Sequence, residues 1–313
     1  MTPDILAAWE RIAPQTRETP LEPAHLPDPV WLKLEHLQHT GSFKFRGACH
    51  RIARLTADEA AAGVVTASNG NHALGVAAAA RARGIAAEVY VSAQVAPAKA
   101  RRIEAMGARL QRAGEDPLTA ELAARRAAEA TGRVYISPYN DLDVVAGQGT
   151  IAVELHRQAP DLDAVFVAVG GGGLIAGIGT YLKAVSPRTE IVGCWPENSP
   201  VMLRCMEAGR IVDVPEQPTL SESTAGGLEP DSVTLPLCRA AIDRGVLVTE
   251  EEILAAMRLL LHTEHWVVEG AAGVALAAFL KDAARYRGKR AAVVLCGRNL
   301  STAVLERVTG AVR

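Results

Sequence analysis

One lysine carries the first chemical signal in this chain of 313 residues. Lys44 lies in the segment Thr40-Gly-Ser-Phe-Lys-Phe-Arg-Gly-Ala48, between two of the chain's four phenylalanines. Apolar surroundings lower the pKa of an amine because burial disfavours its charge. Such an amine is partly neutral and can form a Schiff base with an aldehyde. We therefore interpret Lys44 as a nucleophile and not as a surface lysine.

A run of four glycines, residues 170–173, is the second signal, and it stands between an apolar run and a helical pattern. Backbone N–H groups without side chains, at the start of a helix, form a cradle for an anion such as phosphate. The spacing of Gly171, Gly173 and Gly177, with Glu197 about 20 residues later, also imitates a dinucleotide fingerprint. No Gly-Lys-Ser/Thr follows the glycines, which argues against a nucleoside-triphosphate loop.

The elements that must position these residues alternate regularly along the chain. The expected strands are residues 63–67, 87–91, 133–136, 164–169, 190–194 and 290–295, and the expected helices are 71–83, 98–106, 117–131, 144–157 and 173–184. This alternation predicts β-α-β units, and the apolar strands predict parallel sheets with helices on both faces.

The composition is that of a globular protein, with 49% hydrophobic and 22% charged residues and a net charge of −2. A near-neutral chain argues against nucleic-acid binding, and no apolar run reaches the roughly 18 residues of a membrane span. The first residues lack the basic-then-apolar order of a signal peptide. We therefore expect a cytoplasmic protein. The five scattered cysteines favour buried thiols over disulfides or a zinc site.

Six separated motifs occur in a recognisable order. They are 35–48, Ser68-Asn-Gly-Asn-His72, Ala146-Gly-Gln-Gly-Thr150, 170–174, Val268-Glu-Gly-Ala-Ala-Gly273 and Cys296-Gly-Arg-Asn299. Together the motifs resemble the serine/threonine dehydratase and serine racemase family of fold-type II pyridoxal-phosphate enzymes. The resemblance covers most of the chain.

The resemblance implies a two-domain α/β fold similar to that of the tryptophan synthase β subunit. It further implies that residues 49–138 form a small α/β domain inserted into a large cofactor-binding domain made of residues 1–48 and 139–313. The family usually forms dimers, so we expect a homodimer that acts on a small amino acid.

The resemblance also assigns roles to single residues. It implies that Lys44 binds the aldehyde of pyridoxal 5′-phosphate and removes the substrate's Cα proton. Further cofactor-binding residues are Phe43, Asn71, Gly170, Gly171, Gly172, Gly173, Leu174, Glu269 and Cys296. The substrate carboxylate is expected on the loop that contains Ser68, Asn69, Gly70 and His72.

The implied reaction removes the β-hydroxyl of a 3-hydroxy amino acid such as L-threonine or L-serine and ends in a 2-oxo acid and ammonia. Cys296 is expected opposite the pyridine nitrogen, where a neutral thiol is a weak partner. Less negative charge then drains into the ring, which favours β-elimination. Arg298 stands where the family usually has glycine, and its side-chain position stays open.

This sequence departs from the family at three places. Asn69 stands where racemases have a second serine, and an amide is no proton donor, which argues against a racemase; alternatively Asn69 caps the following helix. Many relatives bind a cation where this chain has Trp195 and Val201, which lack oxygen ligands, so we expect no divalent metal at that position.

The third departure is the segment 219–229, where relatives usually read Ala-Asp-Gly in place of Ser221, Glu222 and Ser223. This loop borders the substrate in the family. A bulkier substrate, such as a phenylserine or a hydroxyaspartate, is therefore as admissible as serine or threonine.

Other functions stay open on the sequence alone. A dehydrogenase could use the glycine run for NAD, but it gives no role to Lys44. A non-catalytic protein would bind pyridoxal phosphate without releasing a keto acid. A serine racemase or a β-replacement synthase would share the fold.

Overall fold

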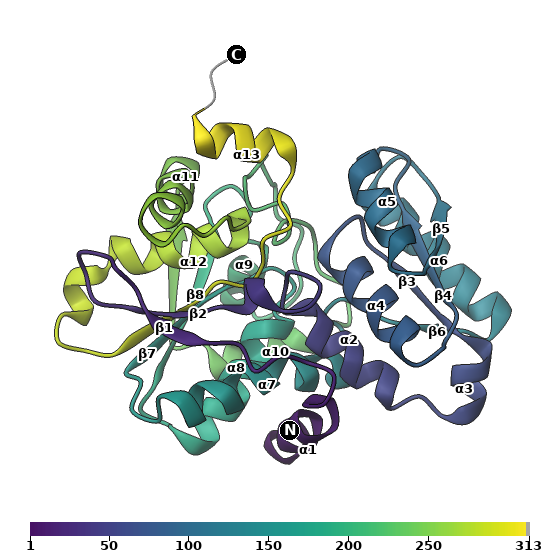
Figure 1. Ribbon diagram of the computed structural model, residues 1–313, viewed down its shortest axis with the longest axis horizontal. Helices are drawn as coiled ribbons and strands as arrows, with labels where there is room; N and C mark the ends of the chain where they lie inside the picture. Colours follow the sequence, from purple (N-terminus) through teal and green to yellow (C-terminus); the bar gives the residue numbers. More distant parts are fainter. Residues whose placement is uncertain (311–313) are drawn as a thin grey trace.

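Two sheets organise residues 1–310, which the computed structural model describes (Figure 1). The larger sheet has the strand order β1-β2-β10-β7-β8-β9, and the smaller has the order β5-β4-β3-β6. Every pair is parallel except β1 with β2. The predicted α/β class with parallel sheets is confirmed.

The elements alternate much as the apolar pattern predicts. The strands are β1 (Leu21–Pro23), β2 (Trp31–Lys33), β3 (Val64–Ala67), β4 (Ala87–Val91), β5 (Arg109–Arg112), β6 (Val134–Tyr135), β7 (Ala164–Ala168), β8 (Glu190–Pro196), β9 (Arg244–Val248) and β10 (Ala291–Val294). The helices are α1 (Thr2–Ile12), α2 (Lys44–Ala53), α3 (Ala57–Ala62), α4 (Asn71–Ala82), α5 (Pro97–Ala105), α6 (Pro117–Thr131), α7 (Leu142–Gln158), α8 (Gly173–Val185), α9 (Val201–Ala208), α10 (Thr234–Ala241), α11 (Glu250–Leu259), α12 (Gly270–Lys281) and α13 (Thr302–Thr309). Three short helical turns are η1 (Glu35–Leu37), η2 (Leu260–Glu264) and η3 (Ala283–Tyr286).

The larger sheet is covered on both faces. Strands β7 and β10 are buried along their whole length. Helix α12 packs on β7, β8, β9 and β10, while α8 packs on β7 and β8, and Figure 1 shows the two helices on opposite sides of the sheet. Burial from both sides is the reason these strands read as unbroken apolar runs.

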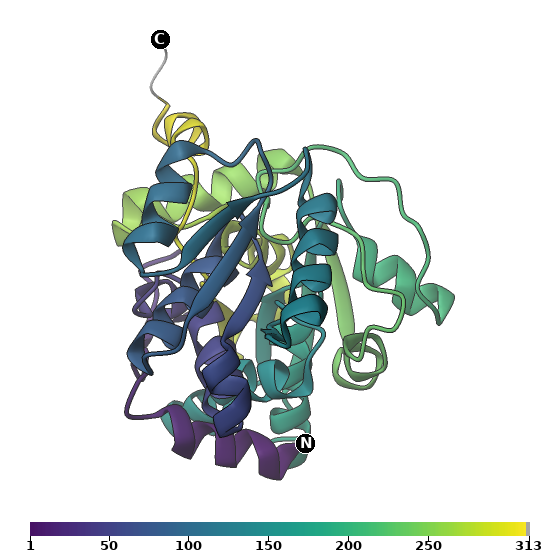
Figure 2. The same ribbon diagram turned by 90° about the vertical axis from the view of Figure 1, so that its right-hand side faces the viewer.

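The smaller sheet stands in front of the larger one in Figure 2. Helices α4 and α6 both pack on β3 and β4. Its strand β5 was not expected, because Arg-Leu-Gln-Arg has no apolar run. This strand pairs only with β4 at the edge of the sheet, and an edge strand tolerates polar side chains.

All four strands of the smaller sheet lie within residues 64–135, and all strands of the larger sheet lie outside that range. Helix α2 runs across the expected boundary at residues 48 and 49 and packs against both α4 and α7. The division into residues 49–138 and the two flanking segments stays a prediction.

Buried ion pairs anchor α2. The Arg46 guanidinium donates to Glu35 Oε2 at 2.8 Å and to Glu154 Oε1 at 2.6 Å, and Lys33 Nζ donates to Glu154 Oε2 at 2.6 Å. All four side chains are fully or almost fully buried. Removing one partner from such a cluster leaves an uncompensated charge and typically costs about 3–5 kcal/mol. The cluster therefore fixes the helix that begins at Lys44.

The five cysteines are free and buried, as the sequence predicts. No helix within residues 1–310 is long and apolar enough to cross a membrane.

Three chain segments reach one place because they follow the carboxyl ends of parallel strands. The loop 68–72 follows β3, the glycine run follows β7, and Cys296 follows β10. Ligands of open α/β sheets commonly bind at this edge.

Candidate active site

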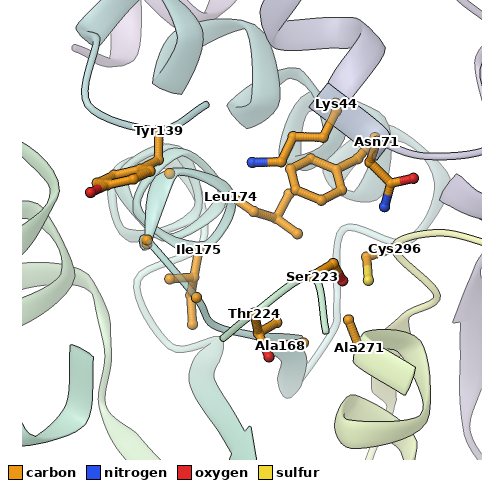
Figure 3. Close-up of a pocket in the computed structure, with 15 residues that line it drawn as sticks. Lys44, Asn71, Tyr139, Ala168, Leu174, Ile175, Ser223, Thr224, Ala271 and Cys296 are labelled. Carbon is orange, nitrogen blue, oxygen red and sulfur yellow. The ribbon is translucent and has the colours of Figure 1, made fainter. Parts of the chain in front are cut away.

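A cavity of about 460 Å³ lies where these segments meet (Figure 3). Its lining comprises Phe43, Lys44, Asn71, Tyr139, Ala168, Gly170, Gly171, Gly172, Gly173, Leu174, Ile175, Ser223, Thr224, Ala271 and Cys296. Nine of the ten residues that the sequence singles out for cofactor binding, all except Glu269, thus border one pocket.

Lys44 is the first residue of α2, and its amine reaches into the pocket toward Tyr139 (Figure 3). Nζ donates to the carbonyl oxygen of Pro138 at 2.8 Å and lies 5.1 Å from the centre of the Phe43 ring. Burial lowers the pKa of this ammonium to about 8, and Cys296 and Glu269 only partly oppose the shift. The amine is thus far easier to deprotonate than an exposed lysine.

The glycine run leaves no room for side chains. A Cβ on Gly171 would lie 2.4 Å from the Tyr139 ring, and one on Gly170 would lie 2.9 Å from the Thr224 backbone. Gly172 has φ +83°, a conformation that L side chains rarely adopt. Helix α8 begins at the next residue, so its first N–H groups have no partner within the helix and face the pocket. These features form a cradle for an anion.

Glu269 lies behind the pocket wall and gathers four hydrogen bonds. Asn71 Nδ2 donates to both carboxylate oxygens at 2.9 and 2.8 Å, Ser223 Oγ donates at 2.9 Å, and the Asn299 backbone N–H donates at 3.2 Å. Burial raises the pKa of Glu269, and the donated hydrogen bonds oppose the rise. The hydrogen bonds to this carboxylate therefore fix the orientation of the Asn71 side chain.

Cys296 stands at the far side of the pocket from the Lys44 amine, beside Ser223 and Ala271 (Figure 3). Its side chain is buried. Burial raises the pKa of the thiol well above its ordinary value, and the carboxylate of Glu269 adds to the rise. The thiol is neutral at physiological pH.

The loop expected to hold the substrate carboxylate is only partly placed at the pocket. Ser68 Oγ accepts from the N–H of Gly70, and the buried His72 bonds the Ile136 carbonyl through Nε2, so neither side chain lines the cavity. Asn69 exchanges two hydrogen bonds with Ser92 and does not cap α4. Asn69 and Gly70 line a neighbouring cavity instead.

Several residues in or near the site could not be identified from the sequence pattern. Tyr139 packs beside Gly171, and its hydroxyl accepts from the N–H of Glu229, a contact that only packing reveals. Gln148 does not line the pocket, but its Nε2 donates to the same Pro138 carbonyl oxygen as Lys44 does. Arg298 is exposed and is absent from the pocket lining, so it is not aimed at Cys296.

Trp195 and Val201 stand where the family resemblance implies a cation site. Trp195 and Val201 are both buried. Within residues 1–310, no group of three or more His, Cys, Asp or Glu side chains is placed to hold a metal ion. That no divalent metal binds at these positions stays a prediction.

Known proteins resemble this chain over most of its length. The L-threonine ammonia-lyase of Thermotoga maritima is 40% identical over 89% of the chain and 69% of that protein. The phenylserine dehydratase of Ralstonia pickettii is 37% identical over 97% of the chain and 93% of that protein.

A solved structure is also similar to this chain over nearly its whole length. Maize serine racemase superposes with a TM-score of 0.92 at 29% identity, over 99% of this chain and 97% of that one. Residues 12–297 match the family described as pyridoxal-phosphate dependent enzyme. The amine, the glycine cradle and these likenesses lead to one conclusion: this chain belongs to the pyridoxal-phosphate dependent enzyme family.

Proposed function

We propose that the protein is an ammonia-lyase that eliminates water from a 3-hydroxy amino acid and, after water hydrolyses the resulting imine, yields a 2-oxo acid and ammonia, with L-threonine or L-serine as the first candidates. The observation that carries the proposal is the Lys44 amine, easily deprotonated and placed in the same pocket as an anion cradle. Family membership sets aside the dehydrogenase alternative.

The pocket residues fit pyridoxal 5′-phosphate. The unpartnered N–H groups at the start of α8 suit the phosphate, and the glycines give the close approach that a Cβ would block. Lys44 would bind the aldehyde and Asn71 the phenolic oxygen. When bound, the cofactor supplies the electron sink that makes loss of the Cα proton feasible.

The remaining chemistry belongs to the protein's own groups. Lys44 Nζ, when free, would be the base for the Cα proton, and a pKa of about 8 suits a base that works near neutral pH. The Pro138 carbonyl holds the resulting ammonium in place. The neutral Cys296 thiol would face the pyridine nitrogen without fixing a positive charge there, which favours release of the β-hydroxyl.

A lyase fits this pocket better than a racemase. Racemisation needs an acid on the face opposite Lys44, and the amide of Asn69 is already bonded to Ser92 at both ends. An amide has no proton to give at neutral pH. Ser223 and Thr224 border the pocket, so a phenylserine-type substrate is the second candidate, in line with the similarity to phenylserine dehydratase.

The test is release of keto acid from a panel of L- and D-3-hydroxy amino acids. The holoenzyme is expected to turn over at least one member, and Lys44→Ala is expected to lose both turnover and the visible absorbance that borohydride abolishes. Bound cofactor without keto acid from any member would contradict the proposal and favour a non-catalytic binding protein. Equilibration of L- and D-serine would instead indicate a racemase.

The homodimer, the cytoplasmic location and the domain division at residues 49–138 belong to the same proposal. They rest on the family resemblance and on the composition of the chain. Sedimentation of the holoenzyme tests the first of them.

A further inference from the structure

A second cavity, of about 290 Å³, adjoins the active-site pocket between α4, α5 and the segment that follows β10. Its lining comprises Asn69, Gly70, Leu74, Lys99, Arg102, Ile103, Asn299 and Leu300. The two cavities are neighbours because Gly70 precedes Asn71 in the chain and Asn299 Nδ2 donates to Asn71 Oδ1 at 2.6 Å.

Positive charge dominates this second cavity. Lys99 and Arg102 are three residues apart on α5 and so lie on one face of the helix. No carboxylate is among the lining residues. Lys99 pairs with Glu222 at 3.1 Å, but both side chains are partly exposed, and such pairs contribute little.

Arg102 is exposed, and its guanidinium makes one hydrogen bond within residues 1–310. Its Nη1 donates to the neutral amide oxygen of Asn299 at 2.9 Å. In the part of the chain that the structure describes, no carboxylate lies within ion-pair distance of Arg102. A guanidinium has five N–H donors in a planar fork that suits a carboxylate or a phosphate.

Hydrogen bonds connect this cavity to the active site. Arg102 donates a hydrogen bond to the side chain of Asn299, which in turn donates to Asn71, and Asn71 donates to Glu269. The charge of Lys99 also acts on Glu269, whose pKa burial raises and Lys99 lowers. A molecule bound in the second cavity would therefore affect the position of the Asn71 side chain through these hydrogen bonds.

We propose that this second cavity binds a small anion, a carboxylate or a phosphate, through Lys99 and Arg102. The anion is either free in solution or the distal acid of a dicarboxylic 3-hydroxy amino acid. Binding itself is independent of the proposed lyase activity, and only its effect on turnover rests on that function.

The first experiment titrates inorganic phosphate into the holoenzyme by calorimetry in a dilute chloride buffer. The cofactor already fills the glycine cradle, so a saturable site is expected at the second cavity. Arg102→Gln is expected to weaken phosphate binding by about ten- to a hundredfold, the usual range for a charged hydrogen bond, and Lys99→Gln by a smaller factor.

Arg101→Gln is the matched control, because Arg101 is exposed on the same helix and is absent from the cavity lining. Its phosphate affinity is expected to equal that of the unchanged protein. Loss of affinity in Arg101→Gln as large as in Arg102→Gln, or no saturable binding at all, overturns the proposal. This result stands even for a preparation that releases no keto acid.

A second experiment identifies the source of the anion. If the distal acid of the substrate occupies the cavity, Arg102→Gln lowers kcat/KM for 3-hydroxyaspartate about tenfold or more. The kcat/KM for threonine then stays within twofold. Phosphate competes with 3-hydroxyaspartate in this case. If the anion is free, phosphate binds equally well beside either substrate, and the substitution changes both kcat/KM values alike. Unchanged kinetics together with unchanged phosphate binding in Arg102→Gln would contradict both sources.

Discussion

Lys44 and Gln148 share one hydrogen-bond acceptor. Lys44 Nζ donates to the Pro138 carbonyl oxygen at 2.8 Å, and Gln148 Nε2 donates to the same oxygen at 3.3 Å. The Gln148 side chain is fully buried, and its Oε1 has no partner in the described structure. That oxygen lies 2.8 Å from the position a Cβ on Gly173 would occupy. Gln148 therefore connects the resting place of the amine with the glycine turn.

We expect Gln148→Leu to impair proton transfer more than substrate binding. Without the amide, the Pro138 carbonyl loses the donor that helps to fix its direction, so the acceptor of the Lys44 amine is less rigidly placed. A misplaced catalytic group commonly costs about ten- to a hundredfold in rate, so kcat should fall by that factor while KM stays within about threefold. Steady-state kinetics on the best substrate measures both constants.

Gln15→Leu provides the control, because Gln15 lies beyond the end of α1, away from the pocket. Its kcat and KM should match those of the unchanged protein. A rise in KM without a fall in kcat for Gln148→Leu would assign Gln148 to substrate binding and refute the positioning role.

The lowered pKa of Lys44 predicts the pH dependence of cofactor capture. The ordinary lysine value of 10.5 falls to about 8 because burial disfavours the ammonium. The fraction of Lys44 in the reactive neutral form thus increases about tenfold per pH unit below pH 8 and levels off above it. Stopped-flow absorbance after mixing apoenzyme with pyridoxal phosphate should show capture rates that follow this curve.

Free Nα-acetyl-lysine under the same conditions is the reference, and its rate should keep climbing past pH 10. The same pKa shift affects the stability of the apoenzyme. Between pH 8 and 10.5 the lysine is protonated in the unfolded chain and neutral in the folded one, so the contribution of Lys44 to the free energy of unfolding increases as the pH rises. A capture rate that climbs with the reference up to pH 10 would show that Lys44 is not perturbed.

The parts of the fold that local pattern determines could be predicted from the sequence. Strands β7 and β10 are buried on both faces, so their apolar runs stand out, and the glycines at the end of β7 mark a turn that excludes side chains. Lys44 could be singled out because its neighbours in the chain are its neighbours in space, as its distance to the Phe43 ring shows.

Contacts between distant segments could not be predicted in this way. The bonds that Asn71 and Ser223 make to Glu269 join residues 198 and 46 positions apart, and Arg46 meets Glu154 across 108 positions. Residue type alone does not tell which buried carboxylate meets which donor. The bond between Asn69 and Ser92 could not be predicted for the same reason, and the role of the loop 68–72 in holding the substrate carboxylate stays a prediction.

Chelation should leave the activity unchanged. The buried residues Trp195 and Val201 stand where the family resemblance implies a cation, and their side chains offer no oxygen. After exhaustive dialysis against EDTA, keto-acid release should equal that of the untreated enzyme, because these two side chains offer no ligand for a hard cation. A large loss that Mg²⁺ or Ca²⁺ restores would reveal a rearranged site.

Ser223→Gly should shift substrate preference toward larger side chains. Ser223 lines the pocket and donates to Glu269 at 2.9 Å, and the family resemblance implies a glycine at this position. Removing the hydroxymethyl group widens the pocket, and one such group in a pocket is commonly worth about ten- to two-hundredfold in discrimination. The ratio of kcat/KM for phenylserine to that for serine should therefore rise. An unchanged ratio would place the substrate side chain elsewhere.

Gly172→Ala should destabilise both the fold and cofactor binding. Alanine at φ +83° is strained, and its Cβ would lie 2.6 Å from Cys238 Sγ and 2.8 Å from Met202 Cε. Overpacking in a buried place typically costs about 1–3 kcal/mol in addition to the backbone strain. The displaced turn should also weaken the affinity for pyridoxal phosphate about tenfold or more, because the N–H groups that receive the phosphate move with it.

Gly84→Ala separates the two causes. Gly84 has a similar φ of +67°, but nothing lies within 4 Å of its Cβ position. It therefore carries the backbone strain without the clash, and its cofactor affinity should equal that of the unchanged protein. Thermal unfolding and cofactor titration of both variants make the comparison. Equal loss of stability in the two, with cofactor affinity intact in Gly172→Ala, would mean that the glycine turn yields to a side chain and does not form the phosphate cradle.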